Sequence, residues 1–327
     1  GGLRPAQPNF LISRCKMKQS GQQIESYGGK ITMRLLIYGA GVIGSLYAAL
    51  FAQAGYDVSV YARGKRLNTL RTKGLLYQKG NRIRQAGISV LSELRDDDRY
   101  DFIFLTVREN QLFGALSELK TNQSPCIVTM VNSIDDYGKW ESICGKGRIL
   151  PAFPGAGGGI RDGVLDAALT PRLIQPTTFA EISGEKTERT KALSALFRKA
   201  GIPYQQVKDM HLWQLCHLAM VVPIADAYEQ AEHPSEAGRD KKLMRRTAEQ
   251  LKTNFRRLKK ARGKLSPAKM NLFLLLPLPV LTIALSLVFE SAFGNRFMYQ
   301  HAVKAPDEMR RLHEQFYGYL EAETRQS

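Results

Sequence analysis

The sequence predicts an α/β protein, with an N-terminal Rossmann-type doubly wound parallel sheet followed by an all-helical C-terminal domain. In the first half, apolar runs of strand length alternate with helical patterns, and a glycine-rich turn follows the first run. From about Gln205 the pattern becomes helical. A length of 327 residues with 44% hydrophobic residues is typical of two globular domains. We therefore expect a basic leader at 1–32, a sheet domain at 33–204 and a helical domain at 205–327.

The first predicted strand and helix enclose the glycine-rich turn. Met33 to Tyr38 is a short apolar run, and the pattern after the turn is helical as far as Ala54. The turn consists of Gly39, Ala40, Gly41, Val42, Ile43 and Gly44. Its three glycines allow a tight turn, close approach of the backbone to a pyrophosphate, and close packing of the helix on the strand. We therefore expect the turn to bind a dinucleotide whose phosphates lie at the helix N-terminus.

The residues after the second predicted strand decide between the two nicotinamide cofactors. Asp57 to Ala62 forms this strand, and Arg63, Lys65 and Arg66 follow it without an acidic residue. NAD-binding proteins place Asp or Glu here for the ribose hydroxyls, whereas a 2′-phosphate requires cations. An arginine binds phosphate through parallel N–H groups, and the neighbouring cations add positive potential. The sequence therefore favours NADP(H), and a solvated basic loop is the alternative.

Two further predicted strands end in polar residues. Asp101 to Val107 is followed by Arg108, and Cys126 to Val131 is followed by Asn132. Doubly wound sheets bind their ligands at the carboxyl ends of the strands. The Asn132 amide is therefore a candidate to hydrogen-bond a ribose, a nicotinamide amide or a substrate carbonyl. The structural alternative is an Asx turn that closes the strand.

Three segments of the second half predict helices of different character. Lys241 to Ala261 carries an apolar stripe surrounded by Lys and Arg, which predicts a core-packed helix with a solvated basic face. The alternative is a basic amphipathic helix that lies on an anionic membrane. Met270 to Phe289 has no charged residue and is long enough to span a bilayer, but Pro277 and Pro279 favour a turn between two short buried helices. We interpret this segment as helical-domain core or a dimer surface, with membrane attachment as the alternative. Pro306 to Tyr319 predicts a capped amphipathic helix.

The net charge of +17 is concentrated in two segments. Residues 1–32 carry five basic and one acidic side chain, and Arg239 to Lys269 carries thirteen basic and two acidic side chains. A protein that coats nucleic acid would spread its charge, and the sequence shows no RNP-type, zinc-finger or KH motif. We therefore expect no nucleic-acid partner.

The cysteines and the leader indicate the compartment. The four cysteines are unevenly spaced and include no C-x-x-C pair, which fits reduced thiols and predicts neither disulfides nor a metal site. Residues 1–32 contain no continuous apolar segment, so we expect a disordered extension and not a secretory signal. The sequence therefore predicts a cytoplasmic protein without a bound metal.

Several motifs together resemble the ketopantoate reductase (2-dehydropantoate 2-reductase) family. They are the glycine turn with the preceding Ile37-Tyr38, Val107-Arg108-x-x-Gln111, Asn132 after its strand, Arg161-Asp162-Gly163, and the Trp-containing helix after Asp209. The resemblance covers most of the chain from Met33 onward and is stronger in the first half. It implies a Rossmann domain joined to a helical domain, with a 2-oxo acid reduced by NADPH in the cleft between them.

The resemblance also implies roles for individual residues. It assigns Arg63 to the adenine-ribose phosphate. Arg108 takes the position of a cofactor-contacting lysine, a change that keeps the charge and alters its geometry. Gly159 falls where a backbone group of the family meets the cofactor. Glu290 matches a cofactor-facing glutamate, and Asn295 matches an asparagine that we assign to the nicotinamide ribose or the substrate.

The family's catalytic lysine is missing from this chain. Alignment on Leu212-Trp213 places Leu215 at this proton donor, and Ala219 and Pro223 at two family asparagines. Positions four apart share one helix face, so the face that should be polar is apolar here.

Two histidines are candidates to replace the lysine. Reduction of a ketone needs a proton source near the developing alkoxide, and histidine is the side chain best suited to this at neutral pH. His211 lies four residues before Leu215 and near the same face, whereas a shifted alignment would favour His217. The alternative is that both rings only pack beside Trp213.

The sequence therefore predicts an NADP(H)-dependent oxidoreductase that transfers hydride to the carbonyl of a small 2-oxo acid or a related ketone, with ketopantoate as the substrate that the resemblance implies. Asn132, His217 and His211 are the candidate catalytic residues. Two alternatives stay open: a catalytically inactive NADP(H)-binding sensor or regulatory protein, and a membrane-peripheral reductase of an apolar ketone. We also expect a homodimer, and we do not expect a membrane partner.

Overall fold

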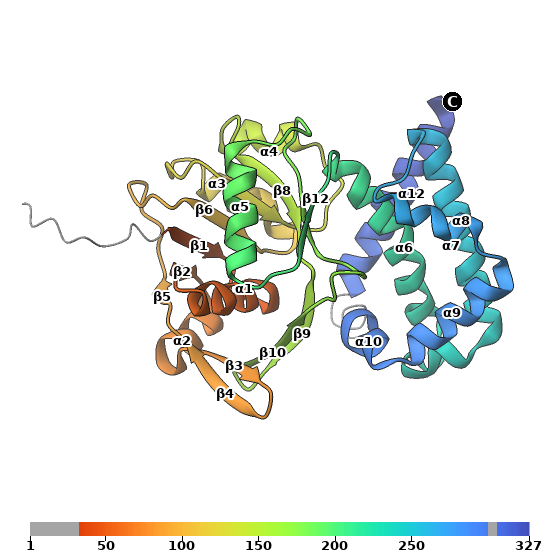
Figure 1. The fold of residues 1–327 in the computed structure, drawn as a ribbon, viewed down its shortest axis with the longest axis horizontal. Coiled ribbons are helices and arrows are strands. Elements are labelled where there is room, and N and C mark those ends of the chain that lie inside the picture. The colour runs from red at the N-terminus through yellow and green to blue at the C-terminus, as the bar shows by residue number, and fades with distance from the viewer. Residues whose placement is uncertain (1–32, 300–305, 327) are drawn as a thin grey trace, which may run out of the picture. The chain divides into compact units, whose positions relative to one another are not determined.

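The computed structural model describes residues 33–299 and 306–326, which belong to one compact unit (Figure 1). The predicted leader at 1–32, including Cys15, lies outside the described residues. Cys126, Cys144 and Cys216 are buried free thiols.

The largest sheet of the described residues has eight strands in the order β12-β11-β8-β7-β6-β1-β2-β5. The strands are β1 (Arg34–Tyr38), β2 (Asp57–Tyr61), β5 (Ser89–Leu91), β6 (Phe102–Leu105), β7 (Ile127–Met130), β8 (Ile149–Phe153), β11 (Thr177–Phe179) and β12 (Tyr204–Gln206). From β8 to β5 all neighbours are parallel. β1 and β6 are neighbours although β2 and β5 intervene in the chain, so they flank the switch point where doubly wound sheets bind ligands.

This topology confirms the predicted Rossmann-type fold, with one difference. β11 pairs antiparallel with β8, so the sheet is parallel only from β8 to β5 and between β11 and β12. β12 extends two residues past the predicted domain boundary at 204, and the first long helix of the second half begins at Met210.

Helices cover both faces of this sheet (Figure 1). They are α1 (Val42–Gln53) and α5 (Glu188–Lys199) on one face, and α3 (Leu112–Glu118) and α4 (Tyr137–Cys144) on the other. Because side chains alternate along a strand, Leu35 and Ile37 of β1 pack with α1, while Leu36 and Tyr38 pack with α3 and α4. α2 (Gly64–Lys73) follows β2.

A second sheet of four strands was not predicted. Its order is β4-β3-β10-β9, formed by β4 (Arg82–Ala86), β3 (Leu75–Lys79), β10 (Val164–Leu169) and β9 (Ala156–Arg161). A Cβ on Gly158 would lie 2.3 Å from the carbonyl oxygen of Asp166, so glycine is what allows β9 to pair closely with β10.

The second half is helical, as predicted. Its elements are α6 (Met210–Gln230), η2 (Pro234–Arg239), α7 (Lys241–Arg262), η3 (Ala268–Asn271), α8 (Leu272–Leu275), α9 (Leu278–Glu290), α10 (Ala292–Gly294), η4 (Asn295–Tyr299) and α12 (Pro306–Gln326). Asp209 and Asp240 cap α6 and α7 by accepting hydrogen bonds from backbone N–H groups of the first turn. The predicted apolar stripe of α7 is fully buried, which confirms the core-packed helix: Met244, Ala248, Leu251, Phe255 and Leu258 are 0% exposed.

The charge-free segment is broken at its prolines, as predicted, but only one side of it is core. α8 has no buried residue, and Ile283 and Leu287 of α9 are exposed, while Leu281 and Leu285 are buried. No single helix of residues 33–299 and 306–326 is long and apolar enough to cross a membrane. By length and composition only, Ala268–Leu275 and Leu278–Glu290 qualify as a pair, with a bend of 115° between them.

A buried lysine of α7, Lys252, binds the turn between α8 and α9. The Lys252 ammonium donates to the carbonyl oxygens of Phe273, Leu274 and Leu276 at 3.1, 3.0 and 2.5 Å. The last carbonyl groups of a helix have no intrahelical donor, so a cation at this end satisfies them and stabilises the helix dipole. The turn between α8 and α9 therefore depends on one charge from α7.

Lys252→Met should lower the free energy of unfolding by about 1.5–3 kcal/mol, because it keeps the apolar stem and removes charge-assisted hydrogen bonds. The measurement is urea denaturation followed by circular dichroism. Lys260→Met, at an exposed position of the same helix, is the matched control and should change stability by less than about 0.5 kcal/mol. Equal transition midpoints for the two variants would contradict the role of Lys252.

Candidate functional site

The glycine turn after β1 has the geometry of a dinucleotide-binding loop. Gly39 has a φ of +110°, a conformation that favours glycine. A Cβ on Gly44 would lie 1.9 Å from the carbonyl oxygen of Gly39 and 2.5 Å from Oγ1 of Thr106, so glycine is required for α1 to pack this closely. A Cβ on Gly41 would meet no atom within 4 Å. The turn is thus closed against the sheet at Gly44 and open at Gly41.

The N-terminus of α1 and one arginine add positive potential to this turn. α1 begins after Gly41 with no side-chain cap and no acidic residue in its first turn, so its first N–H groups are available to an anion. Arg66 donates from Nε to the carbonyl oxygen of Ala40 at 3.0 Å and from Nη2 to the Ser45 hydroxyl at 3.0 Å. Of the two cations predicted to strengthen this site, Arg66 therefore contacts the turn, whereas Lys65 is exposed on α2.

Arg63, the predicted 2′-phosphate ligand, lies in a cluster with Tyr38, Tyr61 and Glu118. Its Nε donates to the Tyr61 hydroxyl and its Nη2 to the Tyr38 hydroxyl, both at 2.9 Å, and Nη2 also pairs with the Glu118 carboxylate. The hydrogen bond with Tyr61, and then that with Glu118, raise the pKa of Arg63. Burial, and then Glu118, raise the pKa of Tyr38. A ligand phosphate must therefore compete with Glu118 for this guanidinium.

Glu109, the residue after Arg108, links the end of β6 to the C-terminal helix α12 through side-chain hydrogen bonds. Arg108 itself is exposed at the start of η1 (Glu109–Gln111). The buried Glu109 carboxylate accepts hydrogen bonds from Arg311 Nη1 at 2.7 Å and from Gln315 Nε2 at 3.4 Å. Both donors lie on α12, and Arg108 and Arg311 line a small hollow between η1 and the start of α12. The sequence pattern did not indicate this connection.

Asn132 carries a buried polar atom that the described residues leave without a partner. Its Oδ1 makes no hydrogen bond within residues 33–299 and 306–326, so it does not close the strand as an Asx turn. The carbonyl oxygen of the preceding Val131 accepts from Gln214 Nε2 at 3.1 Å, and Gln214 accepts from the Tyr137 hydroxyl at 2.9 Å. Gln214, which the sequence analysis did not consider, thus binds α6 to the end of β7.

The two candidate histidines have different surroundings. The His217 ring stacks on Trp213, with ring centroids 5.3 Å apart and an interplanar angle of 7°, and lies 4.4 Å from the ring of Phe153 at the end of β8. His217 is 5% exposed. His211 instead has Nε2 at 3.0 Å from the carbonyl oxygen of Ile134. Packing beside Trp213 is thus observed for His217, which also reaches a strand end.

Leu215, at the position of the family's lysine, faces away from the rings of His217 and Trp213. Leu215 and Ala219 are 0% exposed within the core of the helical domain, and Pro223 is buried inside α6. The apolar face of α6 that the sequence predicts at these positions is therefore observed, and it packs against α7 and α12.

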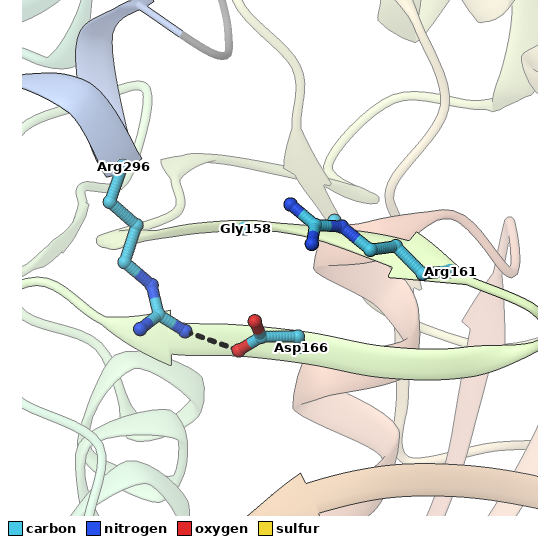
Figure 2. A pocket seen from close by; sticks show the side chains of 5 residues that line it. Gly158, Arg161, Asp166 and Arg296 are labelled. Atoms are coloured by element: carbon cyan, nitrogen blue, oxygen red, sulfur yellow. Dashed lines mark hydrogen bonds and ion pairs between the residues drawn. The ribbon is translucent and has the colours of Figure 1, made fainter.

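Gly159 lies in β9, beside a polar hollow at the second sheet. Figure 2 shows Arg296 of η4 extending down to Asp166 of β10, where Nη2 and Oδ1 are 2.7 Å apart, and the guanidinium of Arg161 extending over β9. Phe297 of η4 packs against β9, because a Cβ on Gly157 would lie 2.7 Å from its ring. The segment that begins at Asn295 therefore contacts the strand that holds Gly159.

Glu290 and Asn295 occupy different environments. Glu290 ends α9 and its carboxylate lies 3.5 Å from Arg239 Nε of η2, within the helical domain. Asn295 is exposed at the start of η4. The structure thus brings Asn295 near β9 and engages Glu290 with Arg239.

Comparison with known proteins identifies relatives of this chain in sequence and in fold. A sequence model of the family described as "Ketopantoate reductase PanE/ApbA" matches residues 35–162. A 2-dehydropantoate 2-reductase of Mesorhizobium japonicum is 27% identical over an alignment of 194 residues, and the match covers 52% of this chain and 58% of that protein. The chain therefore matches little more than half the length of this relative.

Solved structures share the fold over nearly the whole chain. The 2-dehydropantoate 2-reductase from Geobacter metallireducens GS-15 has a TM-score of 0.63 and 15% identity, over 90% of this chain and 100% of that one. A D-mandelate dehydrogenase in complex with NADH has a TM-score of 0.62 and 15% identity, over 90% of this chain and 92% of that one. At these identities the likeness concerns the fold. Residues 35–162 thus match the ketopantoate reductase family model, and the rest of the chain shares the fold of these structures.

Proposed function

We propose that this chain is an NADP(H)-dependent oxidoreductase that transfers hydride to the carbonyl of a small 2-oxo acid or a related ketone. The observation that carries the proposal is the glycine turn at the switch point of the sheet, closed at Gly44 and open at Gly41. The match of residues 35–162 to the family model supports the reaction class, and the names of relatives suggest 2-dehydropantoate as the first substrate to test. The cytoplasmic location and the homodimer stay predictions.

The turn fits the pyrophosphate of a dinucleotide in three respects. The missing Cβ of Gly41 leaves space for the phosphates. The uncapped N–H groups of α1 supply donors, and Arg66 supplies a cation beside them. We assign the pyrophosphate to this position.

Arg63 is our candidate ligand for the 2′-phosphate, and Glu118 is a competitor for it. A planar guanidinium binds two phosphate oxygens at once, but this one already pairs with a carboxylate. A dianionic phosphate beside Glu118 would experience like-charge repulsion, whereas a neutral ribose hydroxyl would not. We therefore propose that Glu118 weakens the preference for NADP(H) that Arg63 provides.

At the reacting end, the nicotinamide supplies the hydride, and the chain must orient the carbonyl and deliver a proton. The buried Oδ1 of Asn132 lacks a donor among the described residues, which a ribose hydroxyl or a nicotinamide amide would provide. We assign the proton to His217, because it lies beside Phe153 at the end of β8 and its ring orientation is fixed by Trp213.

The second candidate function is an NADP(H)-binding sensor without catalysis. The observation that favours it is the burial of Leu215 and Ala219 in the helical core, which leaves the family's proton donor and one of its amides without a counterpart at those positions. NADPH binding without turnover of 2-oxo acids would support this function over the first.

Two alanine substitutions in the glycine turn should affect different properties: one should lower the stability of the fold, and the other should weaken NADPH binding. Gly44→Ala forces a Cβ against backbone and should lower the free energy of unfolding by about 1–3 kcal/mol or more. Gly41→Ala meets no atom, so stability should stay within about 0.5 kcal/mol, while the Kd for NADPH rises at least about tenfold. Urea denaturation and fluorescence titration measure the two quantities. Unchanged NADPH affinity in Gly41→Ala would refute the pyrophosphate assignment.

Arg63 and Glu118 should control cofactor preference in opposite directions. Arg63→Ala should weaken NADPH binding by about tenfold to a hundredfold and leave NADH binding nearly unchanged, because a charge-assisted hydrogen bond contributes about 1.5–3 kcal/mol. Glu118→Gln should strengthen NADPH binding relative to NADH. Lys65→Ala, at a neighbouring exposed cation, is the control. If the NADPH-to-NADH ratio of Kd values is the same in all variants, the cluster does not bind the 2′-phosphate.

His217→Asn should lower kcat about 10²–10⁴-fold with NADPH and an active 2-oxo acid, while the Kd for NADPH stays the same. His211→Asn is the comparison, and its effect should be smaller because His211 contacts a backbone carbonyl. The reverse order of effects would identify His211 as the donor. Absence of turnover by the unmodified protein across a panel that includes ketopantoate would favour the sensor.

A further inference from the structure

The helix pair α8–α9 presents an exposed apolar face. Leu275 is 78% exposed and Leu287 is 64% exposed, which are high values for large aliphatic side chains. We call the set the outer apolar face: Leu272, Leu275, Val280, Ile283, Leu287 and Val288. Contiguous exposed groups of this kind mark interaction sites, whereas single exposed apolar residues do not.

The position of this face follows from the packing of α9. Leu281, Leu285 and Phe289 recur every four residues and are buried in the core of the helical domain. Ile283 and Leu287 recur at the same spacing on the opposite side, so both sides of α9 are apolar while only one is covered by the described residues. The outer apolar face therefore has no function in the core.

A row of cations lies on the side of α7 that faces α8 and α9. Lys252 binds carbonyl groups of α8, and Lys259 Nζ lies 2.9 Å from Oδ1 of Asn271, so this side of α7 faces the segment that leads into α8. Arg239, just before α7, pairs with Glu290 at the end of α9, so the two helices run antiparallel. Helical spacing places further cations on the side of α7 that Lys252 marks. The exposed members of this row are Lys241, Arg245, Arg256 and Lys259, of which Arg245 pairs with Glu249 at 3.1 Å.

We propose that the outer apolar face docks on an anionic phospholipid surface. An apolar strip beside a row of cations matches acyl chains beside phosphate headgroups, and the two attractions add. A second copy of this chain fits less well, because a symmetric contact would bring the same cations together. The inner side of α9 is buried in protein, so the pair would lie in the interface plane. This inference does not depend on the proposed reaction.

Co-sedimentation of the full chain with vesicles tests the proposal. At low salt the protein should sediment with vesicles of phosphatidylcholine and phosphatidylglycerol, and much less with phosphatidylcholine alone. Ile283→Asp/Leu287→Asp should lower the partition coefficient at least about tenfold, because two apolar anchors become charged. Ile83→Asp, at a 57% exposed position of β4, is the matched control and should sediment like the unmodified protein.

A charge-reversal pair tests the cationic row. Lys241→Glu/Arg256→Glu should lower binding to the anionic vesicles at least about tenfold and reduce its dependence on salt. Arg82→Glu/Arg84→Glu, two exposed cations of β4, is the control with the same change in net charge. Equal loss in both pairs would mean that net charge alone attracts the vesicles, which would overturn the proposal.

Two other results would also overturn it. One is that the unmodified protein does not sediment with anionic vesicles at low salt. The other is a dimer by light scattering that Ile283→Asp/Leu287→Asp converts to monomer without any vesicle binding, which would make a second copy the occupant of the face. NADPH titration of each variant is a separate readout, since none of these residues lies at the glycine turn.

Discussion

The close contact of α1 with the ends of β1 and β6 is the constraint on which the candidate site depends. Thr106 donates from its backbone N–H to the carbonyl oxygen of Tyr38 at 2.9 Å and from its hydroxyl to that of Gly39 at 2.8 Å. This leaves no space for a side chain at Gly44. The same helix packs Tyr47 and Phe51 into the core, so any displacement at the turn would disturb the core as well. The ligand site and the stability of the domain are therefore coupled through one glycine.

The helical half is bound to the same edge of the sheet by polar contacts that are buried or partly buried. Gln214 of α6 donates to the end of β7, and Arg311 of α12 donates to Glu109 after β6. His211 adds a contact with the carbonyl oxygen of Ile134. Because buried polar groups are costly without partners, these contacts specify how α6 and α12 meet the strand ends. A reaction at this edge would use side chains from both halves of the chain.

Local pattern predicted the parallel strands and the helix breaks, but not the pairings over long distance. The strands β1, β2, β6 and β7 were predicted to within two residues, because their apolar runs end at glycine or polar residues. The second sheet was missed, since β4 is largely exposed and β9 is rich in glycine, so neither shows an apolar pattern. Arg63 was identified from its place after β2. Its partner Glu118 is 55 residues away, and no spacing rule connects them.

The geometry of α6 separates the position assigned to the family's lysine from the side of the helix that faces the sheet. Residues two apart on a helix point about 200° apart, so Leu215 and His217 lie on nearly opposite sides. Leu215 packs among apolar side chains of the helical core, where a lysine would be desolvated. Trp213, Gln214 and His217 face the sheet through Phe153 and Val131. The position that the alignment on Leu212-Trp213 assigns to the lysine therefore lies on the side of α6 that packs in the helical core. The side that reaches the strand ends does carry a titratable group, so loss of lysine at 215 does not by itself imply loss of a proton donor.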